Sequence, residues 1–258
     1  MKKLLLIAAV ILGCTTASAQ KTLNLSTYSG TNLSQYDGKT LNISVNRQLF
    51  KGWNTISLPF DMSAEQVEAA FGSDCKLEAL VGAEDDGMQL KLNFKDCKSE
   101  GIKANIPYIL YYTGETATKK FTTESAICKD EPATVSFTTL KGVKVTFTGA
   151  QKQTEAKGLY GILARDNTEA AFVNVDDITS GFYATRCYVE LSNGNSTVLQ
   201  TNHISDDVTS VKSVVKAGES VDVYNISGTK VANKIHADKI NSLPAGIYVV
   251  KNKKVLVR

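Results

Sequence analysis

Residue types that usually carry chemistry are scarce in this chain of 258 residues, which has two histidines, one tryptophan and five cysteines. After residue 19 no apolar run reaches the roughly 20 residues of a membrane-spanning helix, so we expect no transmembrane segment in the mature chain. Basic and acidic side chains are nearly balanced, at 29 and 26, which argues against nucleic acid as a partner. The remaining composition, 43% hydrophobic and 21% charged, is typical of a globular protein.

The shortage of histidine limits the classes of enzyme that the chain can represent. A Ser-His-Asp or Cys-His arrangement needs an imidazole beside the nucleophile, whereas His203 and His236 lie in polar segments without a nucleophile signature, and we interpret both as exposed. Two carboxylates suffice for a glycan hydrolase, but the acidic groups at Glu84–Asp86, Asp130-Glu131 and Asp176-Asp177 lie in turns. We therefore predict a non-enzyme without a cofactor, with a carboxylate-based glycan hydrolase as the alternative.

Metal and disulfide chemistry have little support in the residue spacing. Adjacent Glu84, Asp85 and Asp86 are a calcium candidate, although they lack the alternating oxygen ligands of a calcium loop. The cysteines after the apolar start match no zinc-binding pattern and allow either disulfides in an exported chain or buried free thiols. These cysteines are Cys75, Cys97, Cys128 and Cys187.

The first residues have the pattern of a signal peptide. A basic start and an apolar run precede the small-residue tripeptide Ala17-Ser18-Ala19, which predicts cleavage between Ala19 and Gln20 and a signal peptide over residues 1–19. The alternative is a lipoprotein in which Cys14 is acylated. Either reading predicts export, to the extracellular space or the outer-membrane surface, with the periplasm as the other compartment.

The rest of the sequence is dominated by the two-residue alternation of half-buried strands, as in Leu41, Ile43 and Val45. We predict an all-β fold with an antiparallel β-sandwich body over residues 21–207. One short helix is expected between Ser63, its N-cap, and Gly72, its stop. Asn193-Gly194 predicts a hairpin turn. The polar stretch Thr201–Val214 predicts a linker.

After this linker the alternation restarts, and residues 208–258 are predicted to form a small Ig-like β module. It carries nine basic and three acidic residues, against a net acidic body. Its pattern resembles the C-terminal sorting domain of type IX (Por) secretion in Bacteroidota, which implies export and sorting machinery as a partner. The residues that carry the resemblance are Val221, Val223, Tyr224, Gly228, Leu243, Gly246, Tyr248, Lys254 and Arg258.

The body resembles a set of exported, largely uncharacterised Bacteroidales proteins that share a Gly-Trp-Asn-Thr-x-x-Leu-Pro-Phe-Asp segment, here Gly52–Asp61. This resemblance implies location and fold and no activity. Within Pro107–Tyr112 the alternation brings one tyrosine toward solvent, so Tyr111 and Tyr112 are a candidate ligand face. We expect a non-catalytic secreted or cell-surface interaction protein, with a glycan or another surface protein as its ligand and a carbohydrate-binding module as an alternative.

Overall fold

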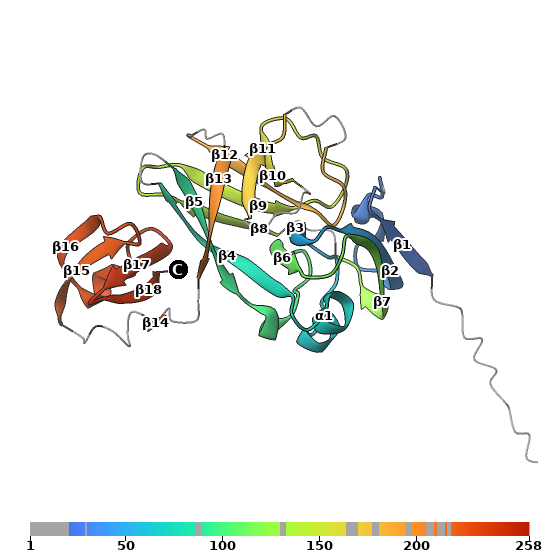
Figure 1. Ribbon diagram of the computed structural model, residues 1–258, viewed down its shortest axis with the longest axis horizontal. Helices are drawn as coiled ribbons and strands as arrows, with labels where there is room; N and C mark the ends of the chain where they lie inside the picture. The colour runs from blue at the N-terminus through green and yellow to red at the C-terminus, as the bar shows by residue number, and fades with distance from the viewer. Residues whose placement is uncertain are drawn as a thin grey trace, which may run out of the picture.

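The fold is all-β, as predicted, with 54% of residues in strands and 9% in helices. The computed structural model describes residues 21–28, 30–85, 89–129, 133–163, 170–176, 181–194, 198–204, 209–210, 215 and 218–257. The predicted signal peptide, its cleavage site at Ala19-Gln20 and the lipobox cysteine Cys14 lie outside these residues. Figure 1 shows the strands gathered in a body, with a smaller sheet beside it.

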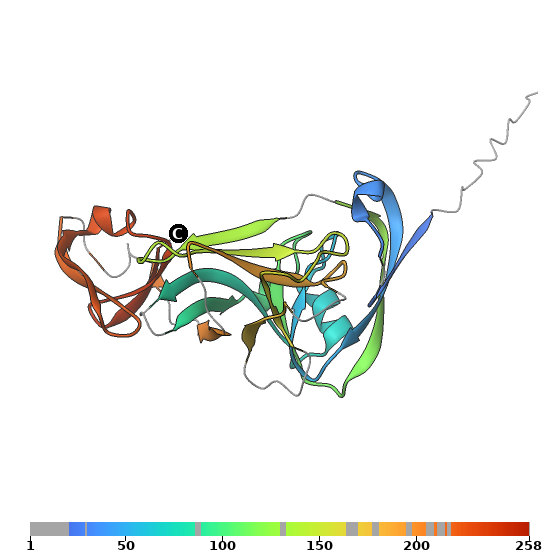
Figure 2. The ribbon, with the colours of Figure 1, turned by 90° about the horizontal axis from the view of Figure 1, so that it is seen from above.

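A three-stranded sheet covers one end of the body (Figure 2). It has the order β1-β2-β7 and consists of β1 (Thr22–Ser26), β2 (Thr40–Leu49) and β7 (Ala117–Ile127). β1 pairs with β2 in parallel, which corrects the expectation that the body strands are antiparallel, whereas β2 and β7 are antiparallel. A short 3-10 helix, η1 (Leu33–Tyr36), lies between β1 and β2 in the chain.

A ten-stranded sheet forms the rest of the body and curls toward itself. In order, its strands are β3 (Gly52–Ile56), β6 (Tyr108–Tyr112), β4 (Lys76–Asp85), β5 (Leu90–Asp96), β13 (Val198–Ile204), β11 (Ala171–Asn174), β10 (Leu159–Ile162), β12 (Cys187–Ser192), β9 (Lys144–Gly149) and β8 (Thr134–Thr138). The end of β3 meets the start of β12, where the Cys187 amide donates to Thr55 Oγ1 at 3.0 Å. The Ser57 amide donates to the Thr185 carbonyl at 3.1 Å. We call this junction the seam.

Two apolar cores lie on the two faces of the curled sheet. One is inside the curl, where Phe94, Phe147 and Phe172 are fully buried and contact one another through their rings. The other lies between the curled sheet and the three-stranded sheet, and includes Leu77 and Ile43. Strands that face both cores therefore bury alternate residues on opposite sides, which explains why their sequences are apolar at both phases.

The helix α1 (Ala64–Phe71) closes the second core and begins and ends where the sequence predicts. The Ser63 hydroxyl accepts from the Gln66 amide at 3.3 Å, and the Gln66 side chain accepts from the Ser63 amide at 2.8 Å. Gly72 has a φ of 99°, which favours glycine and ends the helix. A 3-10 turn, η2 (Lys98–Glu100), follows β5.

The C-terminal segment forms a separate five-stranded sheet with its own core. In order, its strands are β14 (Thr209–Ser210), β18 (Lys253–Val257), β17 (Gly246–Val250), β15 (Ser220–Asn225) and β16 (Lys230–His236), and the short helix α3 (Ala237–Ile240) follows β16 in the chain. This tail sheet touches the body where Gly246 of β17 approaches Gly82 of β4. A Cβ on Gly82 would lie 3.0 Å from the Gly246 Cα, so a side chain there would require the two strands to move slightly apart.

Two local predictions are wrong. Asn193 has the expected positive φ of 62°, but β12 and β13 on either side are not neighbours, because β10 and β11 lie between them. Part of the predicted linker Thr201–Val214 is strand, since Thr201–Ile204 complete β13, which pairs in parallel with β5. Its polar residues are accommodated by side-chain contacts, such as the Asn202 amide that donates to Asn93 Oδ1 at 3.0 Å.

Candidate functional site

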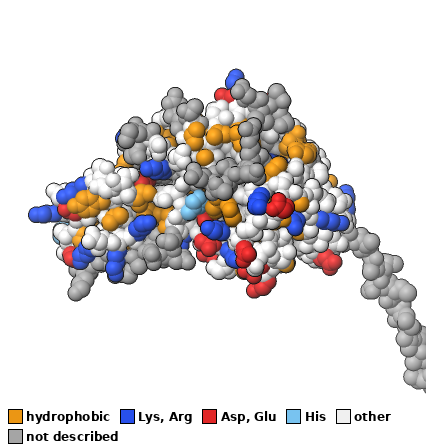
Figure 3. All heavy atoms as spheres, in the orientation of Figure 1, with side chains coloured by type: hydrophobic (Ala, Val, Ile, Leu, Met, Phe, Trp, Pro, Cys, Tyr) orange, Lys and Arg blue, Asp and Glu red, His pale blue; other side chains and the backbone are white. Residues whose placement is uncertain are grey.

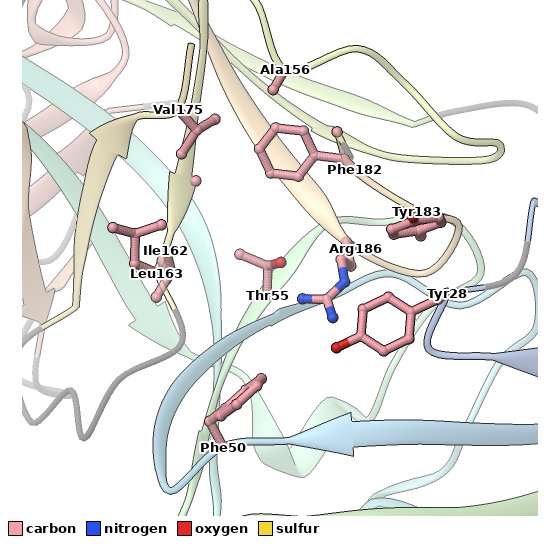
Figure 4. Close-up of a pocket in the computed structure, with 12 residues that line it drawn as sticks. Tyr28, Phe50, Thr55, Ala156, Ile162, Leu163, Val175, Phe182, Tyr183 and Arg186 are labelled. Carbon is pink, nitrogen blue, oxygen red and sulfur yellow. The ribbon is translucent and has the colours of Figure 1, made fainter. Parts of the chain in front are cut away.

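A pocket of about 310 Å³ lies at the seam, at the end of the three-stranded sheet. Figure 4 shows the Arg186 guanidinium projecting between Thr55 and Tyr28 into the space framed by Phe50 and Phe182. Its size is at the lower end of the roughly 300–1,000 Å³ of ligand pockets. We call it the seam pocket; its lining consists of Tyr28, Phe50, Thr55, Ala156, Gly161, Ile162, Leu163, Val175, Gly181, Phe182, Tyr183 and Arg186.

The rim of the seam pocket carries unusual apolar exposure. Among the described residues four large hydrophobic side chains are exposed, and two of them, Tyr28 at 63% and Leu163 at 39%, line this pocket. Tyr28 packs edge-on against Tyr183, with ring centroids 5.5 Å apart, and its hydroxyl donates to Gln48 Oε1 at 3.0 Å. The rim is therefore held in place by side-chain contacts while its apolar surface stays in water.

Arg186 is the one charged side chain among the described lining residues, and within the described chain its guanidinium has neither an ion pair nor a hydrogen bond. Burial lowers its pKa from the ordinary value, although the Tyr28 and Tyr183 phenols act in the opposite direction. The preceding residue, Thr185, is buried and has a φ of 73°. This conformation is rare for a β-branched residue and costs on the order of 1–3 kcal/mol.

Arg47 donates hydrogen bonds to this strained segment. It projects from β2 and is 2% exposed. Its Nη1 donates to the Thr185 carbonyl and, at 3.2 Å, to the Thr185 hydroxyl, and its Nη2 donates to the Thr55 carbonyl. Its Nε has no hydrogen-bond partner. Arg47 thus joins the three-stranded sheet to both sides of the seam.

The charge of Arg47 is opposed by its surroundings rather than balanced by a carboxylate of the described residues. Burial, followed by the positive charge of Arg186, lowers the pKa of Arg47 to about 9. A guanidinium stays protonated in proteins, so the lowering measures the cost of a buried cation. Among the described residues neither Arg47 nor Arg186 forms an ion pair, and the seam holds two positive charges near each other.

A second hollow, of about 470 Å³, lies at one end of the curled sheet. We call it the Trp53 hollow; it is lined by Trp53, Lys76, Tyr111, Ala170, Gln200, Thr201 and His203. The His203 ring stacks on Trp53 with centroids 4.5 Å apart, and its Nδ1 lies 2.6 Å from Oε2 of buried Glu78. His203 Nε2 lies 3.2 Å from the Thr201 hydroxyl, which donates to the Ala170 carbonyl. The imidazole is therefore held on both nitrogens.

The candidate ligand face separates into two environments. Tyr112 is 4% exposed and belongs to the core under the three-stranded sheet, so it is unavailable to a ligand and that part of the prediction is wrong. Tyr111 is half-buried and lines the Trp53 hollow. Its ring packs edge-on against Trp53, with ring centroids 5.1 Å apart. The Lys76 ammonium lies 5.8 Å from the Tyr111 ring centroid.

The calcium candidate is not assembled. Asp86 lies outside the described residues, Glu84 accepts from Asn93 Nδ2 at 2.9 Å, and Asp85 lies 3.9 Å from the Lys141 ammonium. In the described ranges no three His, Cys, Asp or Glu side chains are grouped to hold a metal ion. Glu84 and Asp85 instead contact an amide donor and an ammonium group.

The four cysteines after the apolar start are buried free thiols rather than disulfides. Burial raises the pKa of Cys187 to about 12, opposed by nearby Arg47. Burial also raises the pKa of Cys97 to about 12, reinforced by Asp96 and other carboxylates. Because the thiolate is the reactive form, these thiols are poor nucleophiles at neutral pH.

Three residues of the sorting-type motif belong to the core of the tail sheet, and a fourth, Leu243, packs against it. Val221, Val223 and Tyr248 are buried together, and the Tyr248 hydroxyl donates to the Pro244 carbonyl at 2.7 Å. The other motif positions are buried Gly246, Gly228 with a φ of 81°, half-buried Tyr224 and Leu243, and exposed Lys254. Arg258 lies outside the described residues. Local packing therefore accounts for the apolar part of the motif.

Sequence reasoning missed the arginines of the seam and the Glu78–His203 pair. A signal for Arg47 exists, because Leu41, Ile43, Val45 and Leu49 mark the buried face of β2 and Arg47 falls on that same phase. Glu78 similarly shares the face of Leu80, inside the curl. Thr185, one partner of Arg47, and His203, the partner of Glu78, lie far along the chain, and no local pattern identifies them.

Other surface features identify no further site. Basic and acidic side chains are interspersed over the face visible in Figure 3. Within the described segments, no helix has the length and apolar character required to cross a bilayer. No protein-family model, curated protein or solved structure gives a significant match to the chain.

Proposed function

We propose that this chain is an exported, non-catalytic binding protein and that the seam pocket receives its ligand. The observation that carries the proposal is a preformed pocket whose rim exposes Tyr28 and Leu163 to water. Exposed apolar surface beside a concave site is typical of interaction sites. Neither side chain contributes to a core at this position.

The lining of the pocket favours binding over hydrolysis. A glycan hydrolase needs two carboxyl groups about 5–10 Å apart, and the described lining has none. Most side chains of the described lining are aromatic or aliphatic, and their polar groups are the hydroxyls of Tyr28, Thr55 and Tyr183 and the Arg186 guanidinium. This lining suits a compact apolar body better than a polysaccharide, which would leave many hydroxyls unpaired.

Export and sorting are the second part of the proposal. The signal-peptide pattern at residues 1–19 and the resemblance of residues 208–258 to a type IX sorting domain support delivery to the cell surface or the medium. The tail sheet has a small core of its own and an exposed basic residue, Lys254, in its last strand. In this proposal the tail serves as the address and the body as the binding unit.

The binding proposal is tested with a neutral apolar dye, N-phenyl-1-naphthylamine, whose fluorescence rises in an apolar site. We expect saturable binding to the purified mature chain. Leu163→Asp places a charge on the rim and is expected to weaken binding at least tenfold. Leu140→Asp is the matched control, since Leu140 is also exposed, at 50%, but lies away from the seam pocket. Equal effects of the two substitutions, or no saturable binding, would refute the proposal.

The sorting proposal is tested by deleting residues 208–258 in a host that has the type IX apparatus. We expect the truncated body to fold, by circular dichroism, and to remain in the periplasm while the full chain reaches the surface. Normal surface delivery of the folded truncated body contradicts the sorting role. Loss of folding on truncation contradicts it as well, because the tail then completes the fold.

A further inference from the structure

We propose that the ligand of the seam pocket is a compact amphipathic carboxylate whose head group pairs with Arg186 and whose apolar body lies against Phe50, Ile162 and Phe182. This inference rests on the proposed function, because it assumes that the pocket is a ligand site, and it adds the chemical class of the ligand.

The first step is the missing counter-charge. Arg186 has no partner among the described residues, although burial removes much of the water around it. Arg47 lies near it, fully buried, and its described partners are carbonyl and hydroxyl acceptors rather than a carboxylate, with Nε unpaired. Buried cations are ordinarily paired, so the part of the site that the structure describes lacks a negative charge. A ligand anion would supply it.

The second step is the orientation of Arg186. Its backbone follows Thr185, whose φ of 73° turns the chain immediately before β12 begins. Arg47 holds the Thr185 carbonyl, and the Ser57 amide donates to the same oxygen at 3.1 Å. Strain that is maintained by buried hydrogen bonds is typical of functional positions. Here its effect is to direct a guanidinium into the pocket rather than into solvent.

The third step is the choice of head group and body. The planar fork of a guanidinium matches the two oxygens of a carboxylate. The remaining lining is apolar except for hydroxyls, and the Tyr28 and Thr55 hydroxyls already have partners in Gln48 and the Cys187 amide. A body with many polar groups would therefore lose hydrogen bonds on entry. The volume of about 310 Å³ suits a compact ligand, such as a short chain or a small aromatic group.

The experiment compares 3-phenylpropanoate and octanoate with their neutral amides, which have nearly the same shape. Dissociation constants come from displacement of the naphthylamine dye and from calorimetry, at low and at high salt. We expect the wild-type chain to bind each acid about 10- to 100-fold more tightly than its amide, as for a charged hydrogen bond in a partly buried site. Arg186→Gln should remove this preference while the amides and the dye still bind. Arg186→Lys should retain part of it.

The outcomes separate this inference from the proposed function. Dye binding with equal affinity for acid and amide overturns the carboxylate assignment and leaves the pocket as a ligand site. Absence of both dye and acid binding overturns the function itself. A preference for the acid that survives in Arg186→Gln also overturns the inference, since the charge would then be recognised elsewhere. Lys152→Gln, at an exposed residue outside the lining, is the matched control and should change nothing.

Discussion

The Trp53 hollow and the seam pocket differ in whether a buried charge has a partner within the protein. In the Trp53 hollow, Glu78 is buried, and His203 is within 2.6 Å of it. At the seam, two arginines lie near each other, and within the described chain neither has an acidic partner. The buried carboxylate of the first site has a hydrogen-bonding partner within the protein, whereas the two cations of the second have no acidic partner among the described residues.

The difference separates a charge that stabilises the fold from a charge that is available to a ligand. A pair that satisfies itself contributes to folding and has little left for binding. An unpaired cation costs folding free energy and is retained where it serves recognition. Substitutions at the two sites are therefore expected to have opposite signs, except at Arg47, which combines charge with structural hydrogen bonds.

The largest effect is expected for Arg47→Ala. The substitution leaves a cavity and removes the donors that hold the Thr55 and Thr185 carbonyls across the seam. We expect a loss of about 3–5 kcal/mol in the free energy of unfolding, measured by urea denaturation. Arg47→Lys, which keeps one donor group, should lose less. A loss below about 1 kcal/mol would show that Arg47 does not hold the seam together.

High pH is expected to destabilise the protein through its buried thiols. Folding keeps the proton on Cys187, whose pKa is about 12, whereas the unfolded chain releases it above about 9. The unfolded state therefore binds fewer protons between pH 9 and pH 12, and stability falls as pH rises through this window. We expect a loss of about 2 kcal/mol from pH 9 to pH 11 from this group, by urea denaturation at each pH.

Cys187→Ala provides the control for this pH dependence. It should be less stable than the wild type at pH 8 but lose less stability on going to pH 11. Cys97→Ala should act in the same direction, since burial also raises the pKa of Cys97 to about 12. If the loss of stability between pH 8 and pH 11 is the same in both variants as in the wild type, the buried thiols do not cause it.

Glu78→Gln tests the paired site. The amide keeps an oxygen acceptor but removes the charge opposite His203, so we expect a loss of about 1–2 kcal/mol in stability. The emission of Trp53, the one tryptophan of the chain, should change as well, because its ring stacks on His203. Glu190→Gln, at an exposed position, is the control. Unchanged stability and emission would mean that the Glu78–His203 pair does not contribute to the free energy of unfolding.

Arg186→Met is expected to change stability least of the four predictions. It tests directly whether the charge in the seam pocket is unpaired. It keeps an elongated side chain while removing a partly buried charge without a partner. We expect stability to stay the same or to rise by up to about 1 kcal/mol. Lys152→Met, at an exposed position, is the control. A loss of more than about 1 kcal/mol would show that the protein itself neutralises Arg186, and the two hollows would then be alike.

The fold was more accessible to sequence reasoning than the site, for a physical reason. Alternation and capping are local, so the buried face of β2 at Leu41, Ile43 and Val45 and the two ends of α1 at Ser63 and Gly72 are predicted from neighbouring residues. The seam is not local: Arg47 reaches Thr185 across 138 positions in the chain. Asn193-Gly194 shows the same limit. Asn193 has a positive φ but Gly194 does not, and the pairing of the flanking strands depends on β10 and β11.

The parallel pairing of β13 with β5 has a consequence for the time course of folding. Residues 90–95 pair with residues 199–204, which are synthesised much later. β5 therefore keeps an unpaired edge until nearly the whole body is present. Such long-range pairing is slow, and an open edge is a template for association with other chains. Partly synthesised or truncated forms that end before residue 198 are therefore expected to aggregate. The length of chain that has been synthesised, rather than the strength of any single contact, determines when the body no longer exposes this edge to association with other chains.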